Sequence, residues 1–413
     1  MREESGMKRI VKSVLIVGII AVVFVLSAFK ALTYDEMLNK FQPVFEIISY
    51  VQHSYYDIEK VDYDKVLDET LKGVMKGLDD PFAWYFTPVQ KTENKIDTES
   101  KYGGIGAVVQ YNTKYDALEV VAPMVGSPAE RVGLKVGDII FEVDGHKVSE
   151  TGYYESVNLL RGKPGTDVTV KVYRKGEDEP LVFTITRAEI EIKTVKYSAI
   201  DYNNHRIGYV RITHFSEPTY NEFQKAMFSL LEADGLIIDL RNNPGGLLGS
   251  VLNISSLLIP EGLPVITIRD RNGEERIYRS WGSNFSDFIK GKPIVVLVNG
   301  GSASASEILT GALKDHKIAT VVGTKTFGKA AVQTVYDLSN GGEIWLPTAH
   351  YFTPSGSDIH LKGIEPDITV EASETSTNDG RELTVSKVQL DPETDVQLKT
   401  ALEIIADKLG GAE

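Results

Sequence analysis

Three serines separated by single alanines lie between a strand-like run and a helical run, in the segment NGGSASASEILTGAL at residues 299–313. Glu307 follows Ser304 at the spacing of a capping box, in which each side chain bonds the backbone N–H of the other residue. A second interpretation makes Ser304 a nucleophile, because a strand, a Gly-rich turn and a helix start expose a hydroxyl where α/β folds place their sites. A nucleophilic serine also needs a base and an oxyanion site.

The candidate base is Lys329, in the segment GTKTFGKAAVQ just beyond the next strand pattern. A lysine acts as a base only when it is neutral, so its pKa must fall by roughly three units, which corresponds to about 4 kcal/mol. Phe327 and Val332 are apolar neighbours that favour such a shift. A lone lysine in a loop is otherwise a solvated charge.

The candidate oxyanion site is the segment LIIDLRNNPGGLL at residues 236–248. Paired glycines after a buried strand let backbone N–H groups approach a ligand closely, although they equally suit a tight turn before a helix. Asp239 and Arg241 at the end of the strand are expected to pair and to brace this loop.

Composition excludes several other classes of site. The 413-residue chain has a net charge of −14, which leaves no basic stripe for nucleic acid. It contains no cysteine, and its seven histidines show no metal-ligand spacing. It also lacks a P-loop and a dinucleotide-binding fingerprint. We therefore expect no metal and no cofactor.

The surrounding patterns predict a mixed architecture. Helical periodicity covers residues 33–90, and short strands bounded by turns follow between 103 and 187. After residue 190 strands and helices alternate, which predicts an α/β core with a largely parallel sheet. The expected strands of this core are 206–213, 235–240, 293–299 and 318–323, and its helices are 219–233, 249–259 and 304–315. A polar stretch at 374–390 precedes a final helix at 395–409.

The amino terminus carries four basic residues before the uncharged run Ser13–Phe29, which is as long as a short membrane span. No clean cleavage site follows, so an uncleaved signal anchor is preferred over a cleaved signal peptide. The basic flank predicts a single-pass protein of the cell membrane with its catalytic part outside the cytoplasm, in the periplasm or cell envelope.

Taken together, the motifs resemble the carboxyl-terminal processing peptidases, the tail-specific serine proteases. The resemblance rests on GLDDPFAWY, GGIGAVV, GSPAERVGLKVGDIIFEVDG, LIIDLRNNPGG, GSASASEILTGALKD, GTKTFGKAAVQ and KGIEPDITV, in this order along the chain. It implies a ClpP/crotonase-like protease core with a PDZ domain, helical terminal segments and an N-terminal membrane anchor. The expected domains are an anchor at 1–31, a helical region at 32–97, the PDZ domain at 98–188, the protease core at 189–373 and a linker with a helix at 374–413.

The resemblance also implies roles for single residues. Ser304 is the expected nucleophile, Lys329 the general base, and Gln333 the residue that orients this lysine. Oxyanion N–H groups are expected from Ala305 and from Gly245 or Gly246, whereas Glu307 is expected to be structural. In the PDZ domain, the residues expected to bind the carboxylate of the substrate's C-terminus, or to couple its binding to the core, are Gly104, Ile105, Gly106 and Arg161.

The expected function is therefore a serine endopeptidase that binds protein or peptide substrates with a free, apolar C-terminus and cleaves through an acyl-enzyme. A homodimer through the terminal helices is one further partner expectation. One departure from the family pattern lies beside the base, where Ala330 and Ala331 replace a glycine and a small hydroxyl residue. It motivates an alternative, a membrane-tethered PDZ scaffold with an inactive core, while a crotonase-like acyl-CoA enzyme is disfavoured because it has no use for a PDZ domain.

Overall fold

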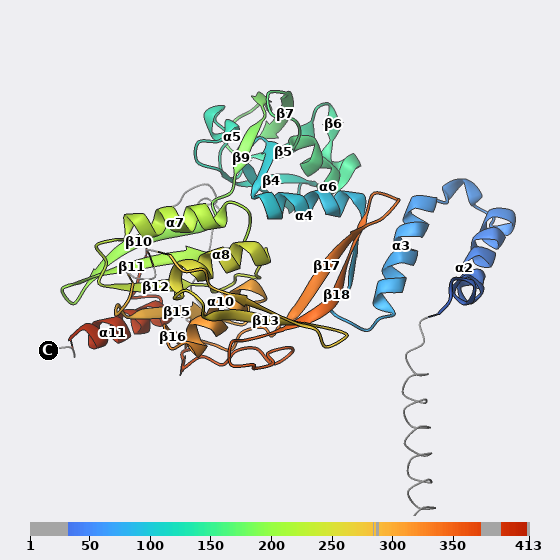
Figure 1. Cartoon of the computed structure of the whole chain (residues 1–413). Coiled ribbons are helices and arrows are strands. Elements are labelled where there is room, and N and C mark those ends of the chain that lie inside the picture. Colours follow the sequence, from blue (N-terminus) through green and yellow to red (C-terminus); the bar gives the residue numbers. More distant parts are fainter. Residues whose placement is uncertain (1–31, 284, 286–288, 373–389, 411–413) are drawn as a thin grey trace, which may run out of the picture. The chain divides into compact units, whose positions relative to one another are not determined.

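The computed structural model describes residues 32–283, 285, 289–372 and 390–410 (Figure 1). The chain divides into two compact units, residues 1–71 and 72–413. The first unit is helical, with α2 (Tyr34–Ser54), the short 3₁₀ helix η1 (Ile58–Lys60) and most of α3 (Tyr63–Lys76). Thr33 and Glu36 form a capping box at the start of α2, with the Thr33 N–H donating to Glu36 at 2.8 Å.

The predicted helices of the first unit form, but α2 buries none of its side chains. Phe41 and Phe45, which the periodicity places on one apolar face, are 44% and 65% exposed. A homodimer through this face stays a prediction.

The centre of the second unit is a six-stranded sheet in the order β10-β11-β12-β15-β16-β19. The strands from β11 to β19 run parallel, and β10 pairs antiparallel with β11. The predicted α/β core with a largely parallel sheet is therefore confirmed. The strands are β10 (Val195–Tyr202), β11 (His205–Ile212), β12 (Gly235–Asp239), β15 (Ile294–Val298), β16 (Thr320–Gly323) and β19 (Ile368–Thr369).

Alternate side chains of this sheet enter two cores, because successive strand residues point to opposite faces. Ile238 and Val296 pack with α7 (Thr219–Ser229), α8 (Leu248–Leu258) and α10 (Ala305–Asp315). Ile237 and Val295 pack on the opposite face with α11 (Val396–Gly410). The result is a three-layer arrangement of helices, sheet and helix (Figure 1).

Asp239 and Arg241 form the predicted ion pair at the end of β12, and the same arginine, which was not predicted to do so, also joins α11 to this sheet. The Asp239 carboxylate is 0% exposed, accepts from Arg241 at 2.6 Å and accepts from the Tyr209 hydroxyl at 2.6 Å. A second edge of the guanidinium donates to Asp395, directly before α11, at 2.8 Å. Burial raises the pKa of Asp239, but Arg241 outweighs it and holds this pKa below the ordinary 3.8.

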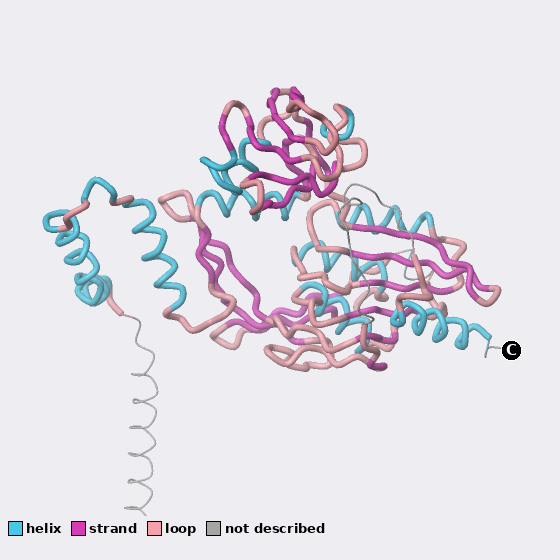
Figure 2. Tube along the Cα trace, turned by 180° about the vertical axis from the view of Figure 1, so that it is seen from behind, coloured by secondary structure: helices cyan, strands magenta, loops and turns pink. Residues whose placement is uncertain are grey.

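A second, five-stranded sheet lies beside the α/β core. Four of its strands pair in the order β1-β18-β13-β14. The fifth strand, β17, pairs with β18 in a long hairpin, which Figure 2 draws in magenta with the other strands. The sequence patterns did not predict this sheet. Its strands are β1 (Trp84–Phe86), β13 (Pro264–Asp270), β14 (Glu275–Arg279), β17 (Ala331–Asp337) and β18 (Glu343–Phe352).

The short strands predicted between residues 103 and 187 form a separate antiparallel sheet, in the order β3-β4-β5-β7-β8 with β6 paired to β5. Leu118 and Val170 anchor the core of this sheet, together with Leu160 of α6. Helix α4 leads into a two-stranded ribbon of β2 and β9. The elements are α4 (Pro88–Glu99), β2 (Lys101–Gly104), β3 (Ala107–Asn112), β4 (Ala117–Pro123), α5 (Pro128–Arg131), β5 (Ile139–Val143), β6 (His146–Lys147), α6 (Val148–Leu160), β7 (Asp167–Tyr173), β8 (Leu181–Thr186) and β9 (Ala188–Glu191).

The prediction of a single-pass membrane location is not supported by the structure. Among the helices of the described residues, none combines the length and the apolar character that crossing a bilayer requires. The predicted anchor at residues 1–31 lies outside the described residues, as does most of the polar stretch at 374–390.

Candidate active site

The three serines before α10 have different environments. Ser302 and Ser306 are 0% exposed, and their hydroxyls donate to the carbonyls of Leu240 at 2.8 Å and Asn243 at 2.9 Å. Ser304 lies between them and is partly exposed. The two flanking hydroxyls therefore hold the loop, and the middle serine is the most accessible of the three.

The backbone of Ser304 adopts φ 53° and ψ −113° at the turn from β15 into α10. A positive φ is uncommon for a residue with a side chain, and strained backbone of this kind collects at functional sites. A serine on a sharp strand-to-helix turn is also the arrangement that exposes the nucleophile of α/β hydrolases. Here Glu307 holds the turn by accepting from the Ser304 N–H at 2.9 Å.

The loop after β12 packs directly against Ser304. Asn243 organises it, since its buried amide donates to the Ile212 carbonyl at 2.8 Å and accepts from the Gly245 N–H at 2.9 Å. Gly245 has φ 104°, and a Cβ built on it would lie 2.8 Å from the Cβ of Ser304 and 2.9 Å from the N of Ala305. Only glycine fits this approach, so the structure brings Gly245 and Ala305 together around Ser304.

Gly246 has φ 135°, and a Cβ on it would lie 2.0 Å from the carbonyl oxygen of Phe215. Its neighbours make the bonds to this strand, because Gly245 O accepts from Phe215 N and Leu247 N donates to Phe215 O, each at 2.7 Å. The Gly246 N–H, which lies between them, points to the opposite side.

Lys329 lies on the loop between β16 and β17 and is half-buried. Its Nζ lies 4.9 Å from the ring centroid of Trp84 and 5.6 Å from that of Phe82. Burial lowers the pKa of Lys329 from 10.5, which is the direction that a general base needs. The ring faces attract the charged form and so oppose part of this shift.

Gln333 belongs to the same neighbourhood, although its amide bonds another partner. Its Nε2 donates to the Phe82 carbonyl at 2.6 Å. Phe82 therefore contacts Gln333 through its carbonyl oxygen and Lys329 through its ring. The orienting role of Gln333 stays a prediction. Phe82 and Trp84 belong to GLDDPFAWY, one of the motifs that carry the resemblance, but neither residue was predicted to lie beside Lys329.

Ala330 and Ala331 do not distort the backbone beside the base. Both are buried, and neither is among the residues with a positive φ. The Ala330 carbonyl accepts from the Tyr351 N–H at 3.0 Å, and Ala331 pairs with His350 in the β17–β18 ladder. Neither residue therefore needs a backbone conformation that a Cβ disfavours.

One buried carboxylate joins the two loops. Glu307 accepts from the N–H of Ser304 and from the N–H of Lys329, each at 2.9 Å. Although Ser304 and Lys329 are distant in sequence, their backbone N–H groups thus donate to the same side chain, which holds the two backbones near each other.

The residues predicted to bind a C-terminus also lie together. Gly104 pairs with Arg161 in an isolated antiparallel β-bridge. Gly106, at φ 72°, packs so closely that a Cβ on it would lie 2.5 Å from the Cβ of Ser127. Ile105 between them is buried. The Arg161 guanidinium lies 5.7 Å from the ring centroid of Tyr102, beside the same loop. Carboxylate binding by this loop stays a prediction.

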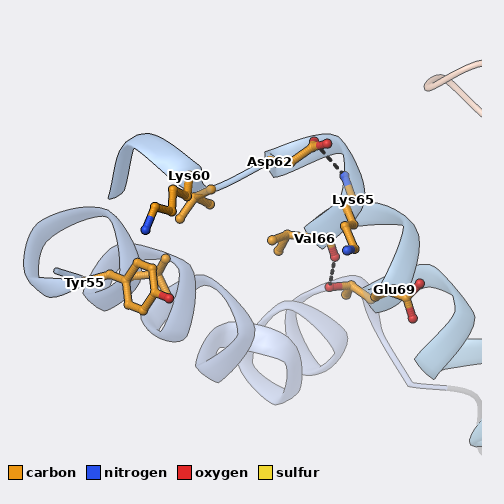
Figure 3. A pocket seen from close by; sticks show the side chains of 9 residues that line it. Tyr55, Lys60, Asp62, Lys65, Val66 and Glu69 are labelled. Atoms are coloured by element: carbon orange, nitrogen blue, oxygen red, sulfur yellow. Dashed lines mark hydrogen bonds between the residues drawn. The ribbon is translucent and has the colours of Figure 1, made fainter. Parts of the chain in front are cut away.

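A hollow of about 630 Å³ lies between α2 and α3 in the first unit (Figure 3). None of the predicted catalytic or carboxylate-binding residues lines it. Its lining residues are Val51, Tyr55, Lys60, Val61, Asp62, Lys65, Val66, Glu69 and Thr70.

Comparison with known proteins finds one family for the α/β core and another for the antiparallel sheet of β3 to β8. Residues 206–370 match the model of peptidase family S41, and residues 103–184 match that of a PDZ domain. The fold is similar to a solved structure from Bacteroides fragilis assigned to S41, with a TM-score of 0.51 and 17% identity over 88% of this chain and 97% of that one.

Curated relatives cover most of the chain. A carboxy-terminal-processing protease of Bartonella bacilliformis is 33% identical over 91% of this chain and 90% of its own length. The carboxy-terminal processing protease CtpB of Bacillus subtilis is 37% identical over 82% of this chain and 68% of its own length. This extent of similarity, together with the Ser304 turn and its glycine loop, shows that the chain belongs to peptidase family S41 and is a relative of the carboxy-terminal-processing proteases.

Proposed function

We propose that this protein is a serine endopeptidase in which Ser304 is the nucleophile and Lys329 the general base, acting on protein substrates that its PDZ domain binds by the C-terminus. The observation that carries the proposal is the environment of Ser304. It is the one partly exposed member of the three serines, it lies on a turn with a positive φ, and its backbone is joined through Glu307 to that of a half-buried lysine.

The chemistry follows from these groups. The Ser304 hydroxyl attacks the scissile carbonyl carbon and gives its proton to the neutral Lys329 amine. When the tetrahedral intermediate collapses, the ammonium returns this proton to the leaving amine, and the acyl group stays on Ser304 as an ester. Water then attacks the ester, its proton passes to Lys329, and the product carboxyl leaves as Ser304 regains its proton.

The negative charge of each tetrahedral intermediate needs preorganised N–H donors. Ala305 begins α10, and the first N–H groups of a helix have no partner within the helix. The orientation of Gly246 supports it as the second donor, whereas the Gly245 N–H already donates to Asn243. Gly245 contributes by its lack of a side chain.

Gly245→Ala tests this loop. We expect kcat to fall about tenfold or more, because the added Cβ requires movement of Ser304 or Ala305, and stability to fall by about 1–3 kcal/mol from the strained φ. Gly249→Ala is the matched control, since a Cβ there meets no atom within 4 Å. Steady-state kinetics and urea unfolding measure both effects. Full activity in Gly245→Ala would remove the loop from the site.

Lys329→Met separates catalysis from stability. We expect peptide cleavage to be lost, because no base remains, while Tm stays equal or rises, because a half-buried amine is replaced by an apolar chain. In the wild type, kcat/KM is expected to rise with pH along a limb below 10.5, since the protonated lysine cannot act as a base. Cleavage by Lys329→Met at the wild-type rate would contradict the assignment.

Recognition of the C-terminus is tested with one apolar-ended peptide in two forms. The free carboxylate is expected to give a kcat/KM at least about tenfold higher than the C-terminal amide, because the amide removes the charge that the N–H groups of the Gly104–Gly106 loop would bind. Equal rates for the two peptides would refute recognition through the carboxylate.

The alternative of an inactive scaffold loses its motivation. It rested on Ala330 and Ala331, and both residues occupy ordinary buried backbone. It would still be recovered if the full chain bound the free-carboxylate peptide without any turnover.

A further inference from the structure

Tyr351 bonds both loops of the active site through their carbonyl groups. Its hydroxyl lies 3.0 Å from the carbonyl oxygen of Ser304 and 2.6 Å from that of Lys329. The side chain comes from β18, in the sheet that the sequence patterns did not predict, and it is 2% exposed. A hydroxyl with one proton shared by two carbonyls fixes their separation rather than that of a single turn.

Glu307 bonds the same two loops through their N–H groups. One carboxylate oxygen accepts from Ser304 N and Lys329 N, and the other accepts from Gly328 N at 2.7 Å and from the Thr326 hydroxyl at 2.6 Å. Burial raises the pKa of Glu307, and these four donors oppose that rise. Helix capping needs only the bond to Ser304, so the other three donors join the Lys329 loop to the helix start.

The two contacts are complementary. Glu307 links the N–H groups of Ser304 and Lys329, and Tyr351 links their carbonyls, so the peptide units on both sides of each residue are held in one frame. Burial raises the pKa of Tyr351 and the nearby Glu307 carboxylate raises it further, which keeps the hydroxyl protonated as a donor.

We propose that Tyr351 and Glu307 are positioning residues that together set the spacing between the nucleophile and its base. This inference rests on the proposed function, and it assigns to neither residue a contact with substrate. A displacement of about 1 Å between reacting groups costs about a hundredfold in rate. We call the Tyr351 hydroxyl and the Glu307 carboxylate together the clamp. The clamp therefore affects kcat and leaves substrate binding, and thus KM, almost unchanged.

Tyr351→Phe in the full chain removes the hydroxyl and nothing else. We expect kcat to fall between about tenfold and a hundredfold, with KM within about twofold of the wild type. Tyr209→Phe is the matched control, since Tyr209 is equally buried and its hydroxyl also makes a short bond, to Asp239 at 2.6 Å. Both variants lose stability, but only Tyr351→Phe is expected to lose kcat.

Glu307→Gln tests the other half of the clamp. Its NH₂ group faces N–H donors where an oxygen accepted before, so kcat is expected to fall at least about a hundredfold. The double variant with Tyr351→Phe should be little worse than Glu307→Gln alone, because both changes release the same spacing. Should Glu307→Gln fail to fold, Tyr351→Phe against Tyr209→Phe still decides the proposal.

The outcomes distinguish this inference from the proposed function. A Tyr351→Phe enzyme with the kcat of Tyr209→Phe, or one that loses activity through KM alone, overturns the clamp while the protease assignment stands. If Ser304→Ala cleaves peptide at the rate of the wild type, the proposed function is overturned instead.

Discussion

Ser304→Ala is expected to lower kcat for peptide cleavage by about a thousandfold or more, because it removes the hydroxyl on which we propose that the acyl-enzyme forms. Its free energy of unfolding should stay within about 1 kcal/mol of the wild type, since the partly exposed hydroxyl is not needed by the bonds that hold the turn. Steady-state kinetics and urea unfolding of the full chain measure the two quantities.

The neighbouring serines are the matched controls. Ser302→Ala and Ser306→Ala each remove a buried bond to the loop, to Leu240 and to Asn243 respectively. We expect each to lose about 1–2 kcal/mol of stability and to keep activity within about tenfold of the wild type. If either control lost cleavage as completely as Ser304→Ala while remaining folded, the distinction among the three serines would be wrong.

Arg241→Met has the largest expected effect on stability. It removes the cation that hydrogen-bonds the Asp239 carboxylate, which is 0% exposed and keeps only the weaker cationic influence of Arg211, and it also removes the bond to Asp395 before α11. Breaking a buried pair in this way costs about 3–5 kcal/mol. Arg269→Met is the control, because its pair with Glu275 is nearly half exposed and is expected to change stability by no more than about 1 kcal/mol.

The pH dependence gives this prediction a sign. In the wild type the pKa of Asp239 lies below its ordinary 3.8, so the stabilisation is present above that pH and is lost as pH falls through the lowered value. In Arg241→Met, burial is the largest remaining influence and raises this pKa, against the smaller lowering effects of Arg211 and the Tyr209 hydroxyl. The variant should therefore recover stability relative to the wild type as the solution is acidified and the carboxylate takes up a proton. A stability difference that does not shrink in acid would contradict this account.

The α/β core was predictable because its strands are continuous apolar runs and its helices have clear periods. The run at 235–240 became β12, and the run at 293–299 became β15. The elements on both sides of the Ser304 loop, β15 and α10, follow from this alternation. The glycine pair at 245–246 was also recognisable in the sequence as a turn or a close approach, because residues with a side chain seldom adopt the positive φ that such positions require.

The β17–β18 hairpin was not predictable in the same way. Strand β18 is partly buried along most of its length and contains Pro347, so it has neither a continuous apolar run nor a clean alternation. Yet this strand delivers Tyr351 to Ser304 and pairs with β1, which carries Trp84 toward Lys329. Such contacts join residues far apart in sequence, and no local pattern encodes them.

The most direct test of the central claim is to identify the residue that a fluorophosphonate serine probe modifies in the full chain, by mass spectrometry of the digested protein. We predict a single adduct on Ser304, absent from Ser304→Ala and strongly slowed in Lys329→Met, with Ser302 and Ser306 unmodified. An adduct on a different residue, or an enzyme that cleaves peptide while Ser304 remains unlabelled at saturating probe, would contradict it.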